Sequence, residues 1–108
     1  MRYFFAVIDN QTNSASSDEM GAIDVFNEKI DSLGHRIMAA GIVSPGEAVV
    51  VDNRGSKGIV SNGPVADSEN YVSGFWIIEA PNDTVAQELA LEASQSCNRV
   101  IEVRRFLR

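Results

Sequence analysis

Two residue types that build reactive and metal-binding sites are almost missing from this chain of 108 residues, which has one cysteine, Cys97, and one histidine, His35. A single cysteine excludes a disulfide within the chain. One histidine and one cysteine are too few for the usual ligand set of a zinc site. We therefore expect no metal and no cofactor. Cys97 ends the apolar stripe of a predicted helix, so we expect it to pack in the core rather than to act as a nucleophile.

Basic side chains are also few, with nine lysines and arginines against fifteen aspartates and glutamates, which gives a net charge of −6. Proteins that bind nucleic acids or anionic membranes place clustered basic side chains against phosphates, so we expect neither partner. No apolar run approaches the roughly 20 residues that cross a membrane. The first ten residues lack the apolar region and cleavage site of a signal peptide. The sequence therefore predicts a cytoplasmic protein.

Apolar residues are present in ordinary amounts, at 44% of the chain, and charged residues make up 22%. Both values are typical of globular proteins. A chain of this length forms one compact domain and is too short for two. We therefore predict a single domain over residues 1–108.

The alternation of apolar and turn-forming residues predicts the element order β-α-β-β-β-α-β. The expected strands span residues 2–8, 47–51, 59–61, 71–80 and 99–107. The short strand 59–61 is the hairpin partner of 47–51. Without it, the order is that of a ferredoxin-like β-α-β-β-α-β plait. We therefore predict an α+β fold with an antiparallel sheet, both helices on one face and an extra hairpin strand.

Two amphipathic helices are expected. The first begins at Ser17 and continues towards Gly41, because apolar residues recur at intervals of three or four as far as Ile37. The second is capped by Asn82 and runs to about Ser96. Each helix has one apolar stripe, which is the pattern of a helix that packs on one side of a sheet.

Two of the predicted strands are apolar on both faces. In strand 2–8, Tyr3 and Phe5 alternate with Phe4 and Ala6. In strand 71–80 the alternating sets are Phe75 and Ile77 against Val72, Trp76 and Ile78. An antiparallel sheet with one face in water should alternate apolar with polar side chains. Since two helices cover only one face, we infer a homodimer in which a second copy covers the other. The alternative is an apolar face that stays exposed.

Few charged side chains are candidates for chemistry. His35 follows Asp31 by four residues on the polar side of the first predicted helix. The pair is either part of a solvated acidic face or a general base oriented by an acid. In the last strand, Arg104 and Arg105 lie on mostly apolar faces, where an arginine either forms a salt bridge or binds an anionic ligand.

The segment NGPVADSENYVSGFWIIEAP, together with NRVIEVRRFL near the end, resembles the YCII-related family, and within it the branch named for a DGPF motif. The resemblance covers nearly the whole chain, residues 1–108. It implies a homodimeric α+β barrel. The matching stretches are Asn62-Gly63-Pro64-Val65, Ser68-Glu69, Gly74-Phe75-Trp76 and Ile101-Glu102-Val103-Arg104.

The resemblance also implies a function. Family members with a His–Asp pair are thought to act as lyases or dehydrochlorinases on small aromatic or cyclic compounds. Their acid matches Asp9, whereas their histidine falls near Asp24, upstream of His35. The aspartate of the DGPF motif is replaced here by Asn62.

Two functions follow as hypotheses. In the first, the homodimer holds a small organic molecule in a cleft beside the sheet, with Asp9 and His35 as candidate catalytic residues of a lyase or dehydrochlorinase. The candidate ligand-binding residues are then Asn62, Gly63, Pro64, Trp76 and Arg104. In the second, the chain is a non-catalytic regulatory or protein-interaction module whose aromatic strands serve only the dimer.

Overall fold

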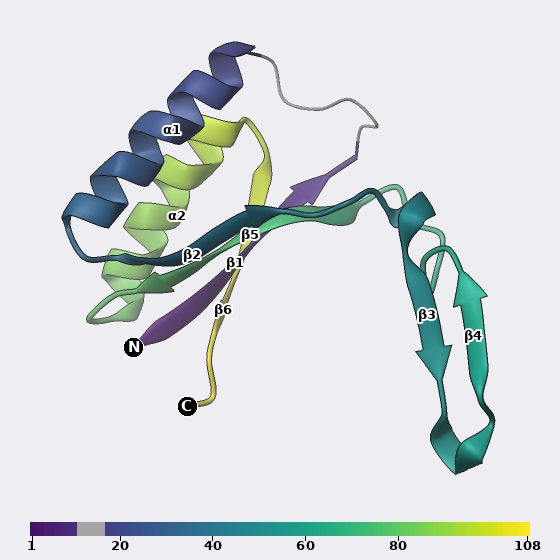
Figure 1. Ribbon diagram of the computed structural model, residues 1–108. Helices are drawn as coiled ribbons and strands as arrows, with labels where there is room; N and C mark the ends of the chain where they lie inside the picture. The colour runs from purple at the N-terminus through teal and green to yellow at the C-terminus, as the bar shows by residue number, and fades with distance from the viewer. Residues whose placement is uncertain (11–16) are drawn as a thin grey trace.

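The computed structural model describes residues 1–10 and 17–108. The elements of the main body are β1 (Arg2–Asp9), α1 (Ser17–Ser32), β2 (Arg36–Gly41), β5 (Tyr71–Glu79), α2 (Asp83–Cys97) and β6 (Val100–Arg105). The four strands form one antiparallel sheet in the order β2-β5-β1-β6. Both helices lie on one face of this sheet (Figure 1). The architecture is mixed α+β and consistent with the predicted ferredoxin-like plait.

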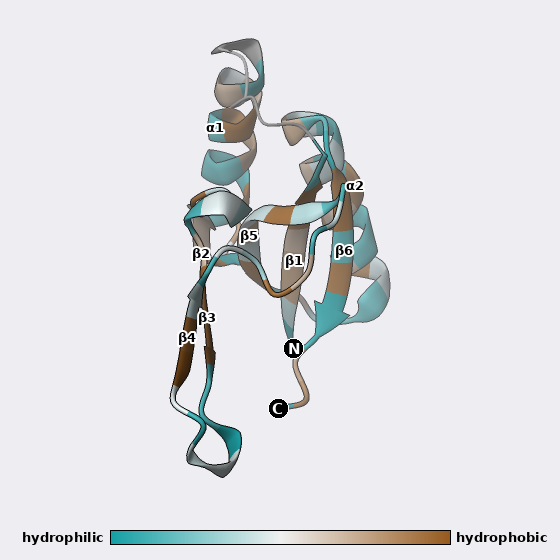
Figure 2. Ribbon diagram, turned by 90° about the vertical axis from the view of Figure 1, so that its right-hand side faces the viewer, coloured by the Kyte–Doolittle hydropathy of each residue, from teal (hydrophilic) through white to brown (hydrophobic). Residues whose placement is uncertain are grey.

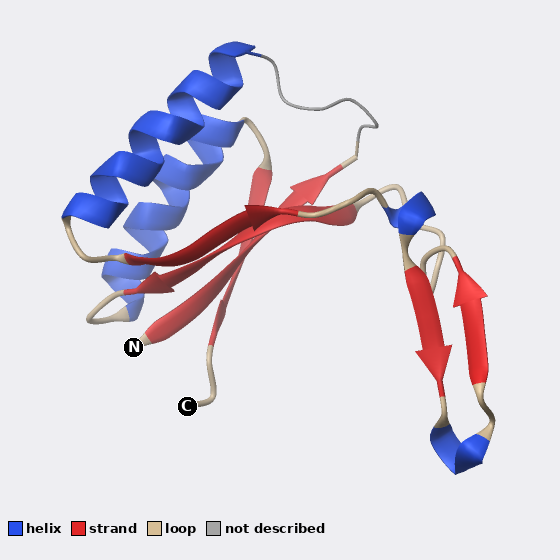
Figure 3. Ribbon diagram, viewed as in Figure 1, coloured by secondary structure: helices blue, strands red, loops and turns tan. Residues whose placement is uncertain are grey.

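A separate two-stranded hairpin, which we call the arm (residues 49–62), lies between β2 and β5 in the chain. Its strands are β3 (Val49–Asp52) and β4 (Ile59–Asn62), which pair antiparallel. The arm projects away from the sheet (Figure 3). The predicted hairpin is therefore confirmed, but its first strand does not belong to the main sheet as the plait prediction required, because β2 occupies that place.

The first helix is shorter than predicted and ends at Ser32. Gly34 adopts a left-handed backbone conformation with φ +77°, and its N–H donates to the carbonyl of Asp31 at 3.1 Å. The N–H of His35 donates to the carbonyl of Ile30 at 2.8 Å. These two bonds form the Schellman arrangement that ends many helices at a glycine.

Beyond this glycine the chain forms β2 instead of the last turns of a helix. The prediction of a longer helix depends on the helical spacing of Leu33 and Ile37. These side chains are 59% and 47% exposed. Neither side chain therefore contributes to the core. Because Gly34 ends the helix, the chain turns back and β2 pairs with β5 as an edge strand.

The second helix agrees with its prediction to within one residue at each end. The Oδ1 atom of Asn82 accepts a hydrogen bond from the N–H of Val85 at 2.9 Å, which is the ordinary role of an asparagine cap. At the other end Asn98 is left-handed, with φ 53°, and its N–H donates to the carbonyl of Ser94. Both ends of α2 are thus fixed by local hydrogen bonds.

The core lies between the sheet and the two helices. The largest fully buried side chains come from β1, α1 and β5: Tyr3, Phe5, Ile30 and Ile78. The surface of α2 that enters the core includes small residues, namely Ala86, Ala90 and Ala93. Small side chains allow a helix to approach a sheet closely, so the bulk of the core is supplied by the strands and by α1.

The other side of the sheet, which we call the uncovered face, has no described helix over it (Figure 1). The strand register places these side chains on it: Phe4, Met38, Phe75, Ile77, Val100, Glu102 and Arg104. The rings of Phe4 and Phe75 stack with centroids 5.5 Å apart. Met38 and Val100 remain 50% and 66% exposed. The sheet is therefore apolar on both faces, as the alternation predicts.

A register shift interrupts the alternation near the start of β5. Because of it, Val72 pairs with Ile8 and lies on the uncovered face, whereas Tyr71 pairs with Asp9. Bulges of this kind redirect the side chains that follow them. The prediction that Val72 shares a face with Trp76 is therefore wrong.

Candidate functional site

A cavity of about 580 Å³ lies between α1 and the half of the sheet formed by β2 and β5. Its apolar lining includes Val7, Met20, Ile23, Ala39, Ile42 and Trp76. Its charged and hydrogen-bonding lining includes Asp9, Asp24, Asn27, Arg36, Tyr71 and Arg99. A mostly apolar cavity with a few polar groups is the usual composition of a site for a small organic molecule.

Trp76 forms one wall of the cavity and is 4% exposed. Its indole Nε1–H donates to Oδ1 of Asn27 on α1 at 2.7 Å. The ring of Phe26 meets the indole edge-on, with centroids 5.4 Å apart. The hydrogen bond satisfies the one polar group of the indole. The aromatic wall is therefore fixed to α1 by both a polar and an apolar contact.

A buried ion pair between Asp9 and Arg99 belongs to the polar part of the cavity lining. Nε of Arg99 is 3.2 Å from Oδ2 of Asp9, and the side chains are 13% and 9% exposed. Nη1 of Arg99 is 3.6 Å from Oε1 of Glu19 and donates to the carbonyls of Cys97 and Asn98 at 3.3 Å and 3.0 Å. One guanidinium thus joins the end of β1, the first turn of α1 and the end of α2.

Burial alone lowers the pKa of Arg99, but its hydrogen bond to Asp9 and the charges of Asp9 and Glu19 outweigh it and raise that pKa above its ordinary value. The guanidinium is therefore always charged. Cys97, which also lines the cavity, is 4% exposed. Burial raises the pKa of its thiol, so the thiol is neutral at physiological pH. This agrees with the expectation that Cys97 packs in the core.

Arg36 gives the cavity a second cation. It lies at the start of β2 and is exposed, and within the described part of the chain no ion-pair partner is recorded for it. Asp24 of α1 is an exposed acid of the same cavity. The lining therefore carries two carboxylates and two guanidiniums, of which Asp9 and Arg99 are bound to each other. Arg36 and Asp24 are the charged groups open to a ligand from outside.

Of the site residues that the sequence suggests, the structure brings Asp9 and Trp76 to the same cavity. Arg104 lies opposite Phe4 on the uncovered face, on the other side of the sheet. Asn62 and Gly63 lie at the base of the arm, where the N–H of Gly63 donates to the carbonyl of Ala48 at 2.7 Å. Gly63 has φ +100°. The Asn62-Gly63-Pro64 turn lies at the end of β4, where the chain leaves the arm. None of its three residues lines the cavity.

His35 lies beyond the end of α1, so the predicted helical pair with Asp31 does not form. Its Nδ1 is 2.8 Å from the carbonyl oxygen of Glu79, which can only accept a hydrogen bond. The N–H of Glu79 donates in turn to the carbonyl of His35 at 2.7 Å. Asp9 pairs with Tyr71 at the other end of β5. Within one chain, the two candidate catalytic residues are therefore at opposite ends of the sheet.

Sequence reasoning did not assign Asn27, Arg36, Tyr71 or Arg99 to the site. A buried tryptophan needs an acceptor for its N–H, but nothing in the sequence indicates that Asn27 supplies it. Arg36 lies in a segment predicted as helix, where it would not face the sheet. Tyr71 reaches the cavity only because of the register shift in β5. Arg99 is expected from the sequence only as the first residue of the predicted strand 99–107.

No helix of the described residues is long and apolar enough to cross a membrane. In residues 1–10 and 17–108, no three histidine, cysteine, aspartate or glutamate side chains gather as they would around a metal ion. Comparison with known proteins adds no assignment: the chain matches no protein-family model, and it matches no curated protein.

Proposed function

We propose that this chain is a YCII-like homodimer that binds a small organic molecule in the cavity between α1 and the sheet. The observation that carries the proposal is the cavity itself, with its volume of about 580 Å³ and its mostly apolar lining. Sites for small ligands fall in the same range of volume and have the same composition.

The lining favours a ligand with an apolar body and a polar end. Trp76, fixed by Asn27, offers a flat aromatic surface for a ring. The polar end of the molecule lies near Arg36 and Asp24, the charged groups of the lining that are open to a ligand. Small aromatic or cyclic compounds, the substrates that the family resemblance implies, fit this description.

Lyase or dehydrochlorinase activity is the catalytic form of this proposal. Asp9 is the candidate catalytic residue that lines the cavity, so it is the group to test first. The position of His35 at the far end of β5 argues for a separate, structural role of that residue. Binding is therefore proposed independently of catalysis.

The homodimer part of the proposal is supported by the uncovered face. Phe75 and Phe4 stack there, and Val100 and Met38 are at least half exposed. A second copy with the same face would cover all of these side chains at once. The same face also supports the alternative function, a non-catalytic interaction module, in which the apolar surface binds a different protein.

The test of binding uses Trp76, the only tryptophan in the chain. Aromatic and cyclic compounds, with and without a carboxylate, are screened for a change in tryptophan fluorescence and for a rise in Tm. A true ligand changes both signals, and Ala39→Phe, which fills the cavity, abolishes both. Ala22→Phe, on the exposed side of α1, is the matched control and keeps them. If no compound of the set moves either signal, the cavity is not a binding site for this class.

A further inference from the structure

The arm extends far outside the body of the protein. The radius of gyration is 15.7 Å, whereas a compact chain of this length has a value of about 13 Å. In residues 49–62, all of which the structure describes, neither strand contains a buried residue. An isolated two-stranded hairpin in water is marginally stable at best. The arm therefore lacks the packing that such a hairpin normally needs.

Both strands of the arm contain hydrophobic residues, as the brown segments of β3 and β4 show (Figure 2). Val51 and Val60 lie directly opposite each other on one side and are each 67% exposed. Val49 on the same side is 56% exposed, and Ile59 on the other is 47% exposed. Contiguous exposed apolar residues of this kind mark interaction surfaces.

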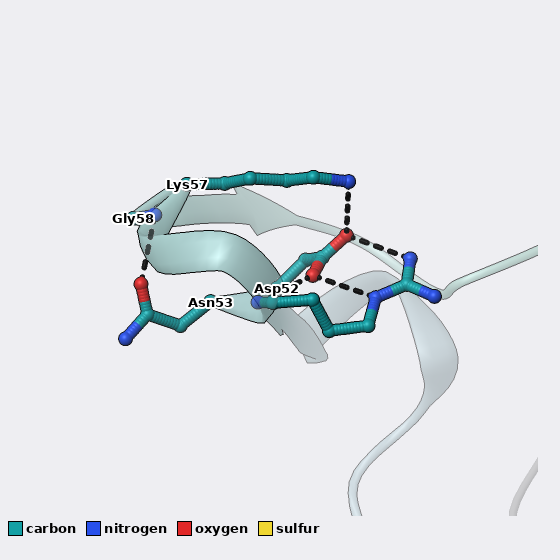
Figure 4. A network of polar contacts seen from close by, with 5 residues as sticks. Asp52, Asn53, Lys57 and Gly58 are labelled. Carbon is teal, nitrogen blue, oxygen red and sulfur yellow. Dashed lines mark hydrogen bonds and ion pairs between the residues drawn. The ribbon is translucent and has the colours of Figure 1, made fainter.

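The shape of the arm is nevertheless fixed at its tip by polar contacts (Figure 4). Asp52 accepts hydrogen bonds from Nε and Nη2 of Arg54 at 3.0 Å and 2.9 Å, and Nζ of Lys57 lies 3.7 Å away. Oδ1 of Asn53 accepts from the N–H of Gly58 at 3.0 Å. These contacts hold the turn at the tip of the arm, which reduces the entropy lost when the arm binds.

The arm and the uncovered face lie on the same side of the protein. In two views at right angles, the arm extends away from the helices, on the side where the sheet lacks a cover (Figures 1 and 2). The arm and the uncovered face, which carries the stacked Phe4 and Phe75, thus border one angular space, with the sheet as one wall and the arm as the other. A partner that covers only the sheet would leave the arm exposed.

We infer that the arm clasps a second copy of this chain, so that in a two-fold dimer each arm lies along the sheet side of the other copy. This inference rests on the homodimer proposed above and adds a second, separable contact to it. An isologous pair covers both arms and both sheet faces with a single operation. Charge does not oppose this contact, because the arm carries a net charge of +1, whereas Glu102 and Arg104 of the uncovered face cancel each other.

The test is the dimer dissociation constant of the full chain, measured by sedimentation velocity over a range of concentrations. The variant is Val51→Glu with Val60→Lys. These two positions pair across the strands, so the new charges attract each other and keep the arm folded and its net charge unchanged. The matched control is Val25→Glu with Leu91→Lys, at helix positions that are 68% and 73% exposed.

We expect the wild-type chain to be a dimer, the arm variant to raise the dissociation constant at least about tenfold, and the helix control to leave it unchanged. A third variant, Val100→Lys on the uncovered face, separates the two contacts. If Val100→Lys weakens the dimer but the arm variant does not, the homodimer stands and the clasp is overturned. If the wild-type chain is monomeric at every concentration, both are overturned.

Discussion

The guanidinium of Arg99 lies 3.2 Å from the carboxylate of Asp9, and water reaches little of either side chain. The two residues are ninety positions apart in the chain, so this contact forms only when β1, α1 and α2 are all in place. The pair lines the cavity, and through Arg99 it also links β1, the first turn of α1 and the end of α2.

Removal of this cation should therefore destabilise the fold. Arg99→Met removes the buried guanidinium that contacts both Asp9 and Glu19, and we expect the free energy of unfolding to fall by roughly 3–5 kcal/mol. Urea denaturation measures it. Arg54→Met is the control, because Arg54 is 84% exposed in its pair with Asp52 and such pairs contribute about 1 kcal/mol or less. Equal losses in both variants would contradict the structural role of Arg99.

Gly74 should not tolerate a side chain. An added Cβ would lie 2.9 Å from the carbonyl oxygen of Ala40 and 3.3 Å from Cα of Gly41 on β2. Gly74→Ala is therefore expected to lower the free energy of unfolding by about 1–3 kcal/mol, the usual effect of overpacking.

The same substitution at Gly21 of α1 should have the opposite sign. A Cβ there meets no described atom within 4 Å, and alanine in a helix interior is more stable than glycine by roughly 0.5–1 kcal/mol. Thermal unfolding of Gly74→Ala and Gly21→Ala side by side checks both. A gain of stability in Gly74→Ala would show that β2 does not pack against β5 as closely as described.

Tyr3 should make stability sensitive to alkaline pH. Its hydroxyl donates to Oδ1 of Asp83 at 2.8 Å, and burial together with the carboxylate of Asp83 raises the pKa of Tyr3 above its ordinary value. The native state therefore holds this proton more tightly than the unfolded state does. Its contribution is complete below about pH 10 and is lost as the pH rises through the raised pKa.

The measurement is Tm against pH for the wild-type chain and for Tyr3→Phe. The variant should have a slightly lower Tm at neutral pH and a shallower decline above pH 10 than the wild type, because it has no phenol to ionise. Parallel curves for the two proteins at high pH would rule out the contribution of Tyr3.

His35 is expected to act in the fold and not in the cavity. His35→Ala removes the hydrogen bond to the carbonyl of Glu79, which should lower the free energy of unfolding by about 0.5–1.5 kcal/mol. Ligand-induced changes in Trp76 fluorescence should stay as in the wild type, whereas Asp9→Asn should alter them. Loss of ligand binding or turnover in folded His35→Ala would restore His35 as a site residue.

Local signals in the sequence predicted the elements that local hydrogen bonds fix. Asn82 caps α2 because its side-chain oxygen accepts a hydrogen bond from the helix backbone. The two apolar faces of β1 and β5 follow from the alternation of side chains along each strand. The missed strand β2 has an equally local cause, since Gly34 ends α1 with a left-handed turn while Ile37 continues the apolar spacing by coincidence. The spacing of apolar residues alone does not show whether a helix continues or ends. A glycine that follows an amphipathic stretch indicates that it ends.

The site was predicted only in part, because its residues meet through register and not through proximity in the chain. Trp76 could be expected on its strand, and Asp9 directly after the predicted strand 2–8. The pairing of Asp9 with Arg99 and the position of Tyr71 depend on how β5 shifts against β1 and on where α2 ends. The register shift leaves no pattern in the sequence, and the predicted end of α2 does not by itself show that Arg99 reaches Asp9.

The segment that leads from β2 into the arm also forms a wall of the cavity. Ile42 and Ser44 of this segment line the cavity, and the N–H of Ile42 donates to the carbonyl of Ser73 at 3.0 Å. A ligand that contacts this segment and a second copy that holds the arm would therefore act on adjoining parts of the chain. Thermodynamic linkage then requires the two equilibria to change together: a ligand that tightens the dimer must bind the dimer more tightly than the monomer.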